Sequence, residues 1–588
     1  MKKTKQQLTG RRNSPEDVAG EASPAERRKN RREAIESLVV VFVAFLVFSL
    51  EAEGFVIPTG SMAPTLMGRH KEIVCPECGD VYTVNADCEV DSSGSGAATG
   101  IQVAWGTCQN CRFTTRVDDT PSVSGDRIYT MKKDLALPLL PQAGRVGPGR
   151  WEVAVFRLPE DPQVRYIKRI VGMPDETIRI QQGDIWRRPS NGSEPFQRLR
   201  RPIAHQLAMQ VLVYDDSHRA ASLRDDPGWR DWVSGPEGWT EPDPETYTCH
   251  ASGKGWSELR YRHVVPDPEQ WEAIRTGRPL AVPPRPTLVT DFSSYNTDLS
   301  PQGRLDRRLA AGPWFQPHWV GDLTMSCRVA VRQAAGRLRL ELIKAGESNR
   351  CELDLSTGQA TLARGQRTVG QPVHTHINTT GTHLVTFANV DDRLTLVVDG
   401  LLPFGDGRHC EPEGSWTGSV PATADLEPAR IAAQGAHLEV TQLVLKRDIY
   451  YTLQPGEFDQ ISSDALPQEG PRGFFDLLAD PARYASLGPP PGRDYPLGPG
   501  RYLMLGDNSP WSRDGRAWGR KDQIDQGDPH SGWDDSGRAS WEVPESLIIG
   551  KAFCVYWPHL KPAWPEFRLG PDQRFLVRPY FERIRWIR

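Results

Sequence analysis

The chain has 588 residues, which is more than one hydrophobic core usually organises, so several domains are expected. Its net charge of −4 excludes the broad positive surface of a nucleic-acid binder, and no nucleic-acid partner is expected. The 50 prolines and 53 glycines indicate many turns and short strands, so the composition predicts a mainly β fold.

The first element in chain order is a basic tail followed by an apolar run. Residues 1–34 carry ten Lys or Arg residues, and an uninterrupted apolar stretch runs from Leu38 to Leu50. Extended to residues 35–57, the run can cross a bilayer at ~1.5 Å per residue. The positive-inside rule then keeps the tail in the cytoplasm. We expect a retained transmembrane anchor rather than a cleaved signal peptide or a soluble core helix, because the charged head is long for a cleaved signal.

A candidate nucleophile follows the apolar run directly, in the string Ile57-Pro58-Thr59-Gly60-Ser61-Met62-Ala63-Pro64-Thr65. Gly60 allows close approach of the backbone to a substrate, and Pro64 stiffens the chain after the serine. Taken alone, a serine between Gly and Pro is more often part of a turn. Ser61 becomes a nucleophile only if a nearby base takes its proton.

Two Cys-x-x-Cys pairs come next, Cys75-Pro76-Glu77-Cys78 and Cys108-Gln109-Asn110-Cys111, with 29 residues between them. Four thiolates in this spacing predict a zinc-ribbon-like insertion over residues 75–111, with Cys75, Cys78, Cys108 and Cys111 as ligands. Disulfides are the alternative, because the segment is expected outside the cytoplasm. Paired knuckles favour structural zinc, and four Cys ligands leave no open position for catalysis, so no catalytic cofactor is expected.

A candidate base lies in the string Tyr166-Ile167-Lys168-Arg169-Ile170-Val171-Gly172-Met173-Pro174. Most lysines on strands are exposed and charged, and a lysine can act as a base only when it is neutral. Moving the lysine pKa from about 10.4 to about 8 requires roughly 3 kcal/mol of disfavoured charging, which apolar burial can supply. Arg169 is either a charged neighbour that contributes to this shift or a surface ion-pair partner.

A long insertion is predicted between about residues 200 and 453. Apolar and polar residues alternate in several runs, such as Leu338, Leu340 and Leu342, and turn residues close them, which indicates an antiparallel β-sandwich. The run from His383 to Gly400 resembles concanavalin-like or laminin-G-like jelly rolls. The Pro- and Gly-rich residues 454–496 are predicted to be a linker.

The last motif is Gly506-Asp507-Asn508-Ser509-Pro510-Trp511-Ser512-Arg513-Asp514-Gly515-Arg516-Ala517-Trp518-Gly519. Together with the Ser61 and Lys168 strings, it resembles the bacterial type I signal peptidases of the S26-type family. The resemblance implies that Ser61 is the nucleophile and Lys168 the general base of a Ser-Lys dyad. It also implies that Ser512 orients the lysine, that Asp514 and Arg516 form a supporting ion pair, and that Thr59 contributes to the oxyanion hole.

Two positions depart from the family pattern. Asp175-Glu176 stands where Gly-Asp is usual, and Gly515 stands where Ser is common. The first could alter a tight turn if that turn needs a positive φ. Gly125-Asp126-Arg127 resembles a further box of the family, which we interpret as structural.

The resemblance divides the chain into a discontinuous catalytic core, over residues 58–74, 112–196 and 497–588, and two insertions. It implies a membrane-anchored serine endopeptidase at the outer face of a bacterial cytoplasmic membrane, which removes signal peptides from exported preproteins. Expected partners are preproteins, the lipid bilayer and the export machinery. Two alternatives stay open: a specialised processing protease with few clients, and a membrane-anchored glycan-binding protein on a degenerate protease scaffold.

Overall fold

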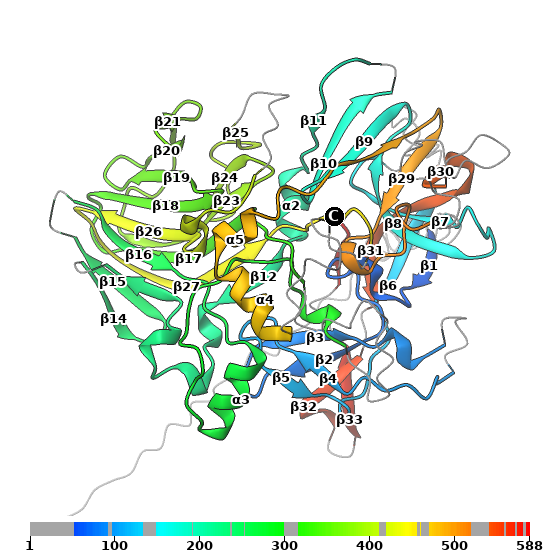
Figure 1. The fold of residues 1–588 in the computed structure, drawn as a ribbon, viewed down its shortest axis with the longest axis horizontal. Coiled ribbons are helices and arrows are strands. Elements are labelled where there is room, and N and C mark those ends of the chain that lie inside the picture. Colours follow the sequence, from blue (N-terminus) through cyan, green and yellow to red (C-terminus); the bar gives the residue numbers. More distant parts are fainter. Residues whose placement is uncertain are drawn as a thin grey trace, which may run out of the picture. The chain divides into compact units, whose positions relative to one another are not determined.

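The computed structural model describes residues 52–91, 97–132, 149–190, 192–235, 238–251, 253, 255–298, 316–410, 419–455, 459, 470–518, 540–557, 560–570, 573–579 and 584–588. The chain divides into two compact units, Met1–Glu53 and Gly54–Arg588, and the second contains every motif discussed below. The described chain is mainly β with few helices, as the composition predicts (Figure 1).

The predicted anchor falls almost wholly outside the described residues, which begin at Ala52. Its last part is not helical, because Ala52–Val56 form strand β1, the neighbour of β6 (Arg127–Lys132) at the edge of a sheet. Within the described part of the chain, no helix is long and apolar enough to cross a membrane. The prediction that the helix continues to residue 57 is therefore wrong, since backbone pairing to β6 requires an extended chain.

The central sheet combines strands from both ends of the chain, as expected for a core interrupted by insertions. Its order is β1-β6-β31-β7-β8-β29-β30, and β34 also pairs with β31. The other strands are β7 (Val153–Arg157), β8 (Arg165–Gly172), β29 (Arg501–Leu505), β30 (Glu542–Pro544), β31 (Ile548–Trp557) and β34 (Arg585–Trp586). A separate hairpin is formed by β32 (Leu560–Gly570) and β33 (Gln573–Pro579).

A second, four-stranded sheet has the order β11-β10-β9-β28. Its strands are β9 (Glu176–Gln181), β10 (Asp184–Pro189), β11 (Gln197–Arg198) and β28 (Arg493–Pro496). Strand β28 comes from the end of the segment predicted to be a linker, and it pairs with β9 in antiparallel register.

The prediction of a linker over residues 454–496 is wrong for its second half. That half contains helices α4 (Gly470–Leu478) and α5 (Pro481–Ala485) before β28. Phe474, Leu477, Leu478 and Tyr484 are buried together in one hydrophobic cluster. Their helical spacing gives these short helices an apolar face to bury, which a count of Pro and Gly does not reveal.

The cysteine-bearing module is larger than the predicted residues 75–111. Two hairpins build it: β2 (His70–Val74) with β3 (Val81–Asn85), and β4 (Trp105–Thr107) with β5 (Thr114–Arg116). Strands β2 and β5, assigned to the catalytic core from the sequence, pair inside the module instead of joining the central sheet. Each Cys-x-x-Cys pair directly follows the first strand of a hairpin, Cys75 after β2 and Cys108 after β4. The pairing of both strands in each hairpin therefore positions the cysteines.

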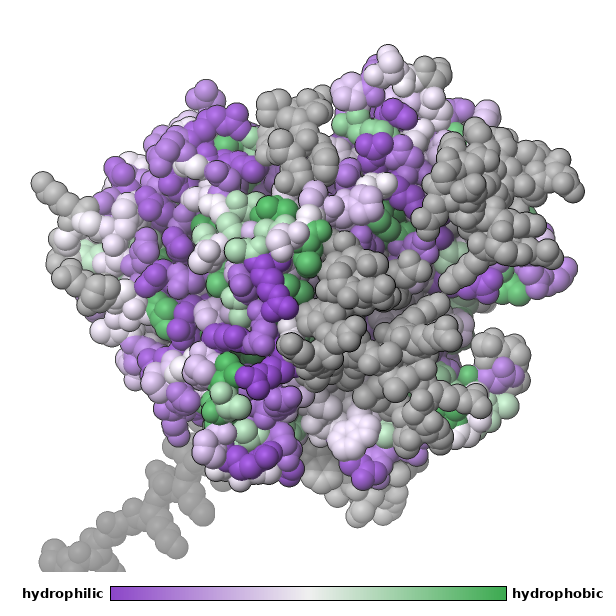
Figure 2. Space-filling model, in the orientation of Figure 1, coloured by the Kyte–Doolittle hydropathy of each residue, from purple (hydrophilic) through white to green (hydrophobic). Residues whose placement is uncertain are grey.

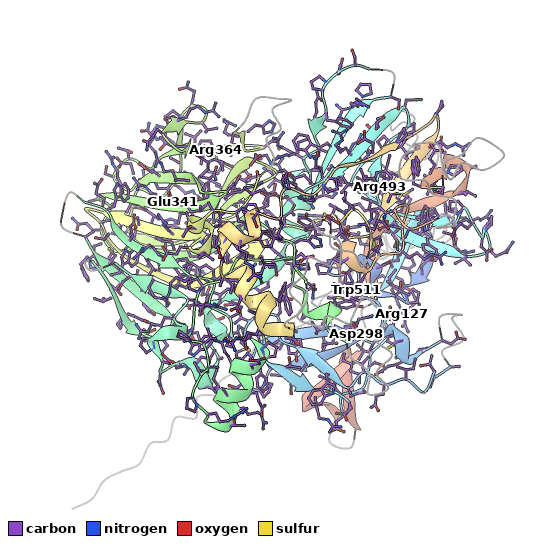
Figure 3. The ribbon with its side chains drawn as sticks, in the orientation of Figure 1. Arg127, Asp298, Glu341, Arg364, Arg493 and Trp511 are labelled. Carbon is purple, nitrogen blue, oxygen red and sulfur yellow. The ribbon has the colours of Figure 1, made fainter. Side chains whose placement is uncertain are left out.

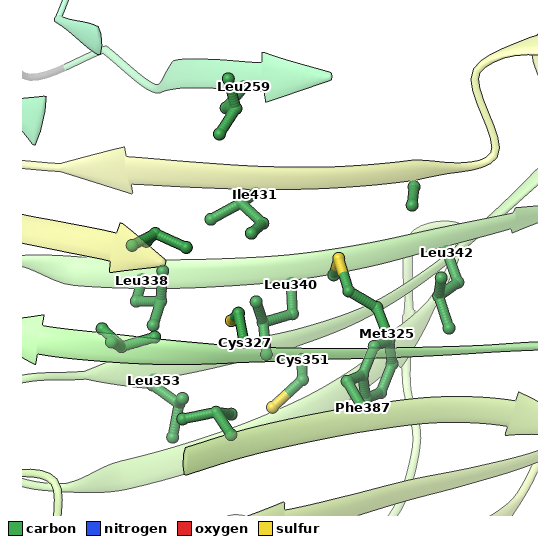
Figure 4. Close-up of a cluster of buried hydrophobic side chains, with 14 of the residues drawn as sticks. Leu259, Met325, Cys327, Leu338, Leu340, Leu342, Cys351, Leu353, Phe387 and Ile431 are labelled. Atoms are coloured by element: carbon green, nitrogen blue, oxygen red, sulfur yellow. The ribbon is translucent and has the colours of Figure 1, made fainter. Parts of the chain in front are cut away.

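Residues 211–447 form two antiparallel sheets that share one hydrophobic core, so the predicted β-sandwich is present. The core includes Met325, Leu340 and Phe387, which project between the sheets (Figure 4). Figure 2 shows that hydrophilic residues predominate on the visible face over the sandwich strands. The more specific jelly-roll type stays a prediction.

The first sandwich sheet has the order β14-β15-β27-β17-β23-β24-β25, with β12 also paired to β27, and the second has the order β13-β16-β26-β18-β19-β20-β21, with β22 paired to β20. The strands of the first sheet are β12 (Val211–Asp215), β14 (Trp239–Asp243), β15 (Thr246–His250), β17 (Leu323–Val331), β23 (Gly381–Val390), β24 (Arg393–Val398), β25 (Arg408–His409) and β27 (His437–Arg447). Those of the second are β13 (Trp232–Ser234), β16 (Ser257–Tyr261), β18 (Arg337–Lys344), β19 (Glu347–Asp354), β20 (Gln359–Arg364), β21 (Arg367–Thr368), β22 (Val373–His374) and β26 (Ala429–Gln434). The insertion also contains α2 (Ile203–Ala208) and α3 (Pro268–Thr276).

Candidate active site

Ser61 lies on a short 3-10 turn, η1 (Gly60–Met62), whose flanks are held by one buried carboxylate residue. The Met67 N–H donates to Asp126 Oδ2 at 2.9 Å, and the Ile57 N–H donates to the Asp126 backbone oxygen at 2.9 Å. Asp126 belongs to the box that the sequence marked as structural, and it is fully buried. The loop that carries Ser61 is thus anchored before and after the serine.

Lys168 lies in the middle of β8, opposite Ala154 of β7. Strand alternation places it on the same face as Tyr166 and Ile170, where the small Ala154 side chain leaves room for it. Lys168 is only 3% exposed, and its Nζ lies 5.2 Å from the Tyr166 ring centroid. The Lys168 Nζ is 2.5 Å from the Ser61 Oγ, so the structure brings the two predicted dyad residues into hydrogen-bond contact.

Burial lowers the pKa of Lys168 to about 8, with Arg516 lowering it further and Asp514 and Asp507 opposing the shift. A shift of this size corresponds to about 3 kcal/mol of disfavoured charging. Near neutral pH a fraction of the amine is therefore uncharged and able to accept a proton. The main cause of the shift is burial, which the apolar residues around Lys168 could supply.

Arg169 does not act as the charged neighbour of Lys168, one of its two predicted roles. Alternation along β8 turns it to the opposite face, where it forms a fully buried, bidentate ion pair with Asp507 at 2.7 and 2.6 Å. It also donates to the Trp151 carbonyl. The arginine that lowers the Lys168 pKa is Arg516, and the ion pair of Arg169 is buried rather than on the surface as expected.

The ion pair expected between Asp514 and Arg516 is present and fully buried. Arg516 donates to the two Asp514 carboxylate oxygens at 2.9 and 2.7 Å, and Asp514 Oδ2 also accepts from the Gly506 N–H at 2.9 Å. Because its carboxylate is fixed by Arg516, Asp514 holds Gly506 close to Ser61. Gly506 begins the last motif of the sequence, which we call the third box. Gly506 is needed there, since an added Cβ would lie 2.4 Å from the Ser61 carbonyl oxygen.

Ser512 is placed differently from the expectation. The Ser512 Oγ is buried and has no hydrogen-bond partner among the described residues, so the expected bond to Lys168 is not present. Its hydroxyl lies against Gly506 instead, 2.1 Å from where a Cβ would stand. Thr59 is exposed directly before η1 and makes no side-chain cap to the turn, and its role at an oxyanion stays a prediction.

The turn after Pro174 tolerates the departure from the family pattern. Asp175 adopts a φ of +62°, so this turn does need the left-handed conformation that glycine usually supplies. Aspartate is one of the residues that adopts it at low cost. Glu176 then accepts from the Met173 N–H and from Arg150 at 2.7 Å each, which fixes the end of β8.

The four predicted metal ligands lie together and are buried. The sulfur atoms of Cys75 and Cys111 are 3.6 Å apart, as are those of Cys78 and Cys108, and all four lie within 4.8 Å of one another. Disulfides need about 2.05 Å between sulfurs, whereas a tetrahedral zinc with bonds of about 2.3 Å spaces its thiolates about 3.8 Å apart. The four thiols are free in this structure, and their spacing fits a tetrahedral ion.

Two residues of the third box contact the site, although the sequence pattern assigns them no role. Asp507 pairs with Arg169, and Asn508 contacts the Ser61 loop. The sequence offered one signal for Asp507: Arg169 had no assigned partner, and a buried arginine requires an acidic one. No signal in the sequence pointed to Asn508.

The site thus pairs a serine hydroxyl with a buried lysine of lowered pKa, the arrangement of a nucleophile beside a base. Residues 98–208 match the family model "Signal peptidase, peptidase S26". The matched segment contains Lys168, but Ser61 and the third box lie outside it.

The chain is also similar to two curated proteins named Signal peptidase I. The protein of Pseudomonas aeruginosa is 30% identical over 141 residues, and that of Pseudomonas fluorescens is 29% identical over the same length. Each alignment covers 24% of this chain and 31% of the relative, so the chain spans about a third of the length of these relatives. Together with the family model, these two likenesses support a relationship of the chain to the peptidase S26 family.

The chain has a weak likeness to a solved structure, the carbohydrate-binding module CBM66 from Bacillus subtilis. The identity is 8%, the TM-score is 0.22, and the alignment covers 37% of this chain and 96% of that one. This TM-score is too low to define a shared fold or to indicate a ligand.

Proposed function

We propose that the chain is a membrane-anchored serine endopeptidase that removes signal peptides from exported preproteins. The observation that carries the proposal is the 2.5 Å contact between the Ser61 hydroxyl and the buried Lys168 amine, whose pKa is lowered to about 8. The contact joins a nucleophile to a base that is partly neutral near pH 7, the pair of conditions that peptide hydrolysis by serine requires.

The reaction proceeds in two steps on these residues. Neutral Lys168 takes the proton of the Ser61 hydroxyl as the oxygen attacks the scissile carbonyl, and the resulting ammonium gives that proton to the leaving amine. Lys168 then takes a proton from a water molecule whose oxygen attacks the acyl carbon, and it returns that proton to the Ser61 oxygen as the ester bond breaks and the acid leaves. The Ser61 N–H, with the Thr59 hydroxyl beside it, is the proposed donor set for the oxyanion.

The substrate segment binds as an additional strand beside β8. Tyr166, Ile167 and Lys168 pair with β7 on one side, and no described strand pairs with their other edge, because β29 begins its pairing at Arg169. An extended peptide can use this edge for main-chain hydrogen bonds next to Ser61. Small side chains before the cleavage site fit shallow pockets along such an edge.

The wider setting of the enzyme is part of the same proposal. Residues 35–51 would anchor the chain in the cytoplasmic membrane, with the basic tail inside and the Ser61 site on the outer face. Cys75, Cys78, Cys108 and Cys111 would hold one structural zinc ion, which supplies cross-linking of the two hairpins and no chemistry at the serine.

The test is cleavage of a purified preprotein with alanines before its cleavage site by the full chain in detergent, followed by the product mass. We expect cleavage after the signal peptide by the wild type and none by Ser61→Ala or Lys168→Ala. Ser356→Ala and Lys446→Ala, substitutions of the same types on the sandwich, are matched controls that should cleave normally. Cleavage by all five proteins would contradict the proposal.

A specialised protease with few clients is a second candidate. It is favoured by one observation: part of the sandwich insertion contacts the third box through Asn296, which hydrogen-bonds to Asn508 at 2.9 Å. An insertion so close to the nucleophile can restrict which chains reach it. Cleavage of only a small subset of a panel of preproteins would support this candidate over a general enzyme.

A further inference from the structure

One short segment of the β-sandwich insertion is buried against the catalytic core. This segment is η6 (Ser294–Asn296), which lies between α3 and β17 in the sequence. Ser294, Tyr295 and Asn296 are each 5% exposed or less. Asp298, just after η6, and Trp511, in η10 (Ser509–Trp511), are labelled in the same region of Figure 3. The insertion is therefore more than a domain joined to the core by its two ends.

Asn296 and Asn508 form a reciprocal pair of hydrogen bonds. Asn296 Nδ2 donates to Asn508 Oδ1 at 2.9 Å, and Asn508 Nδ2 donates to Asn296 Oδ1 at 2.8 Å. The second hydrogen of Asn508 Nδ2 is donated to the Gly60 carbonyl at 3.1 Å, and the Asn508 backbone N–H donates to the Ser61 carbonyl at 3.1 Å. Asn296 thus fixes the amide that holds the residue before the nucleophile.

Tyr295 packs directly on the turn that carries Ser61. A Cβ added to Gly60 would lie 2.2 Å from the Tyr295 Cε1, so only glycine fits beneath the ring. The ring shares a small apolar cluster with Ala63 and Met67, which follow the nucleophile. Tyr295 therefore packs against the same turn that Asn508 holds through hydrogen bonds.

The cysteine-bearing module holds η6 from the other side. The Ser294 N–H donates to Gln109 Oε1 at 2.8 Å, and the Thr107 N–H donates to Thr297 Oγ1 at 2.9 Å. Gln109 lies between Cys108 and Cys111, so the predicted metal site orders one support of η6. Both insertions meet at the loop that carries Ser61.

We propose that Asn296 is a positioning residue for Ser61, acting through Asn508 on the Gly60 carbonyl, and that the sandwich insertion is thereby part of the catalytic unit. The inference rests on the proposed peptidase function. Without Asn296, the Asn508 amide loses two buried hydrogen bonds and is free to turn away from Gly60. The Ser61 Oγ then loses its fixed distance to Lys168, and small misplacements of reacting groups lower rates by large factors.

The experiment measures kcat and KM of the full chain with a quenched signal-peptide substrate for wild type, Asn296→Ala, Asn508→Ala and the double variant. Asn349→Ala, which removes an equally buried asparagine from β19, is the matched control for stability. We expect Asn296→Ala to lower kcat about tenfold or more with little change in KM. We expect no further loss when Asn296→Ala is added to Asn508→Ala, and a normal kcat for Asn349→Ala.

A second readout does not depend on catalysis. The Ala63 amide donates to the Gly60 carbonyl at 3.0 Å, so its hydrogen exchange should accelerate in Asn296→Ala and not in Asn349→Ala. If Asn296→Ala does not fold, Asn296→Ser replaces it. An unchanged kcat, or losses that add independently in the double variant, would overturn the inference. A wild-type chain that cleaves nothing while the exchange result holds would instead contradict the proposed function.

Discussion

The pocket of Lys168 makes a quantitative prediction for Tyr166→Ala. In the wild type the lysine pKa of about 8 leaves about 9% of the amine neutral at pH 7 and about 91% at pH 9. Because only the neutral amine accepts the serine proton, kcat/KM should rise about tenfold over this interval, with a midpoint near pH 8. The direction follows from burial, which disfavours the ammonium and so lowers the pH at which the base becomes available.

Tyr166→Ala removes the aromatic ring that lies 5.2 Å from the Lys168 Nζ. Water then enters the pocket, the ammonium becomes less costly, and the pKa moves up toward about 10.4. A rise of about one unit, or about 1.4 kcal/mol, would move the midpoint to about pH 9 and lower kcat/KM at pH 7 about tenfold. At pH 10 the variant should recover most of the wild-type rate.

The assay is the pH dependence of kcat/KM from pH 6 to 10 on a quenched signal-peptide substrate. Tyr129→Ala, which removes a half-buried tyrosine from β6, serves as the matched control and should keep the midpoint near pH 8. A wild-type midpoint near pH 6.5 would indicate a histidine base and refute the reasoning. A downward or absent shift in Tyr166→Ala would equally refute it.

Three further predictions concern the supports of the site. Asp507→Asn leaves the buried Arg169 without its ionic partner and should destabilise the fold by about 3–5 kcal/mol. The control is Asp494→Asn, whose partner Arg179 is a third exposed. The melting temperature of Asp507→Asn should be lower than that of the control. Gly506→Ala should abolish cleavage, because its Cβ would lie 2.4 Å from the Ser61 carbonyl; full activity would show that the close approach is not needed. By elemental analysis, the wild type should bind one zinc ion per chain and Cys108→Ser should bind none. Cys327→Ser, in the sandwich core, is the control and should keep the zinc ion. Equal zinc contents in all three proteins would exclude the four-cysteine site.

The strings around Ser61 and Lys168 could be predicted because each is a local pattern. The apolar residues near Lys168 indicated that burial could lower the pKa of its amine. The spacing of the four cysteines likewise predicted their clustering. The period-two runs predicted the sandwich, because each run needs a buried face against a second sheet.

Features that depend on long-range packing could not be predicted in the same way. Strands β2 and β5 have no local signal that assigns them to the cysteine module rather than to the core, since only pairing decides it. The helices after residue 469 lie in a stretch whose prolines and glycines dominate its composition. The hydroxyl of Ser512 was assigned by matched position, and its surroundings direct it toward Gly506 instead.

Asn296 is the clearest example of a residue whose contact with the site depends on long-range packing. It lies far from Ser61 and Asn508 in the sequence, within an insertion that the pattern marked as a separate domain. Polar residues in a loop are ordinary, and nothing in Ser294-Tyr295-Asn296 indicates burial. Only the fold shows that this loop contacts the nucleophile turn.

The central claim is that Ser61 carries the acyl group of a cleaved peptide, and trapping this group tests it most directly. The full chain is mixed with an ester analogue of a signal peptide, quenched in acid, digested and examined by mass spectrometry. The account predicts an acyl adduct on the peptide that contains Ser61 in the wild type, and none in Ser61→Ala. Turnover of the ester with the adduct on another residue, or turnover that persists in Ser61→Ala, would contradict it.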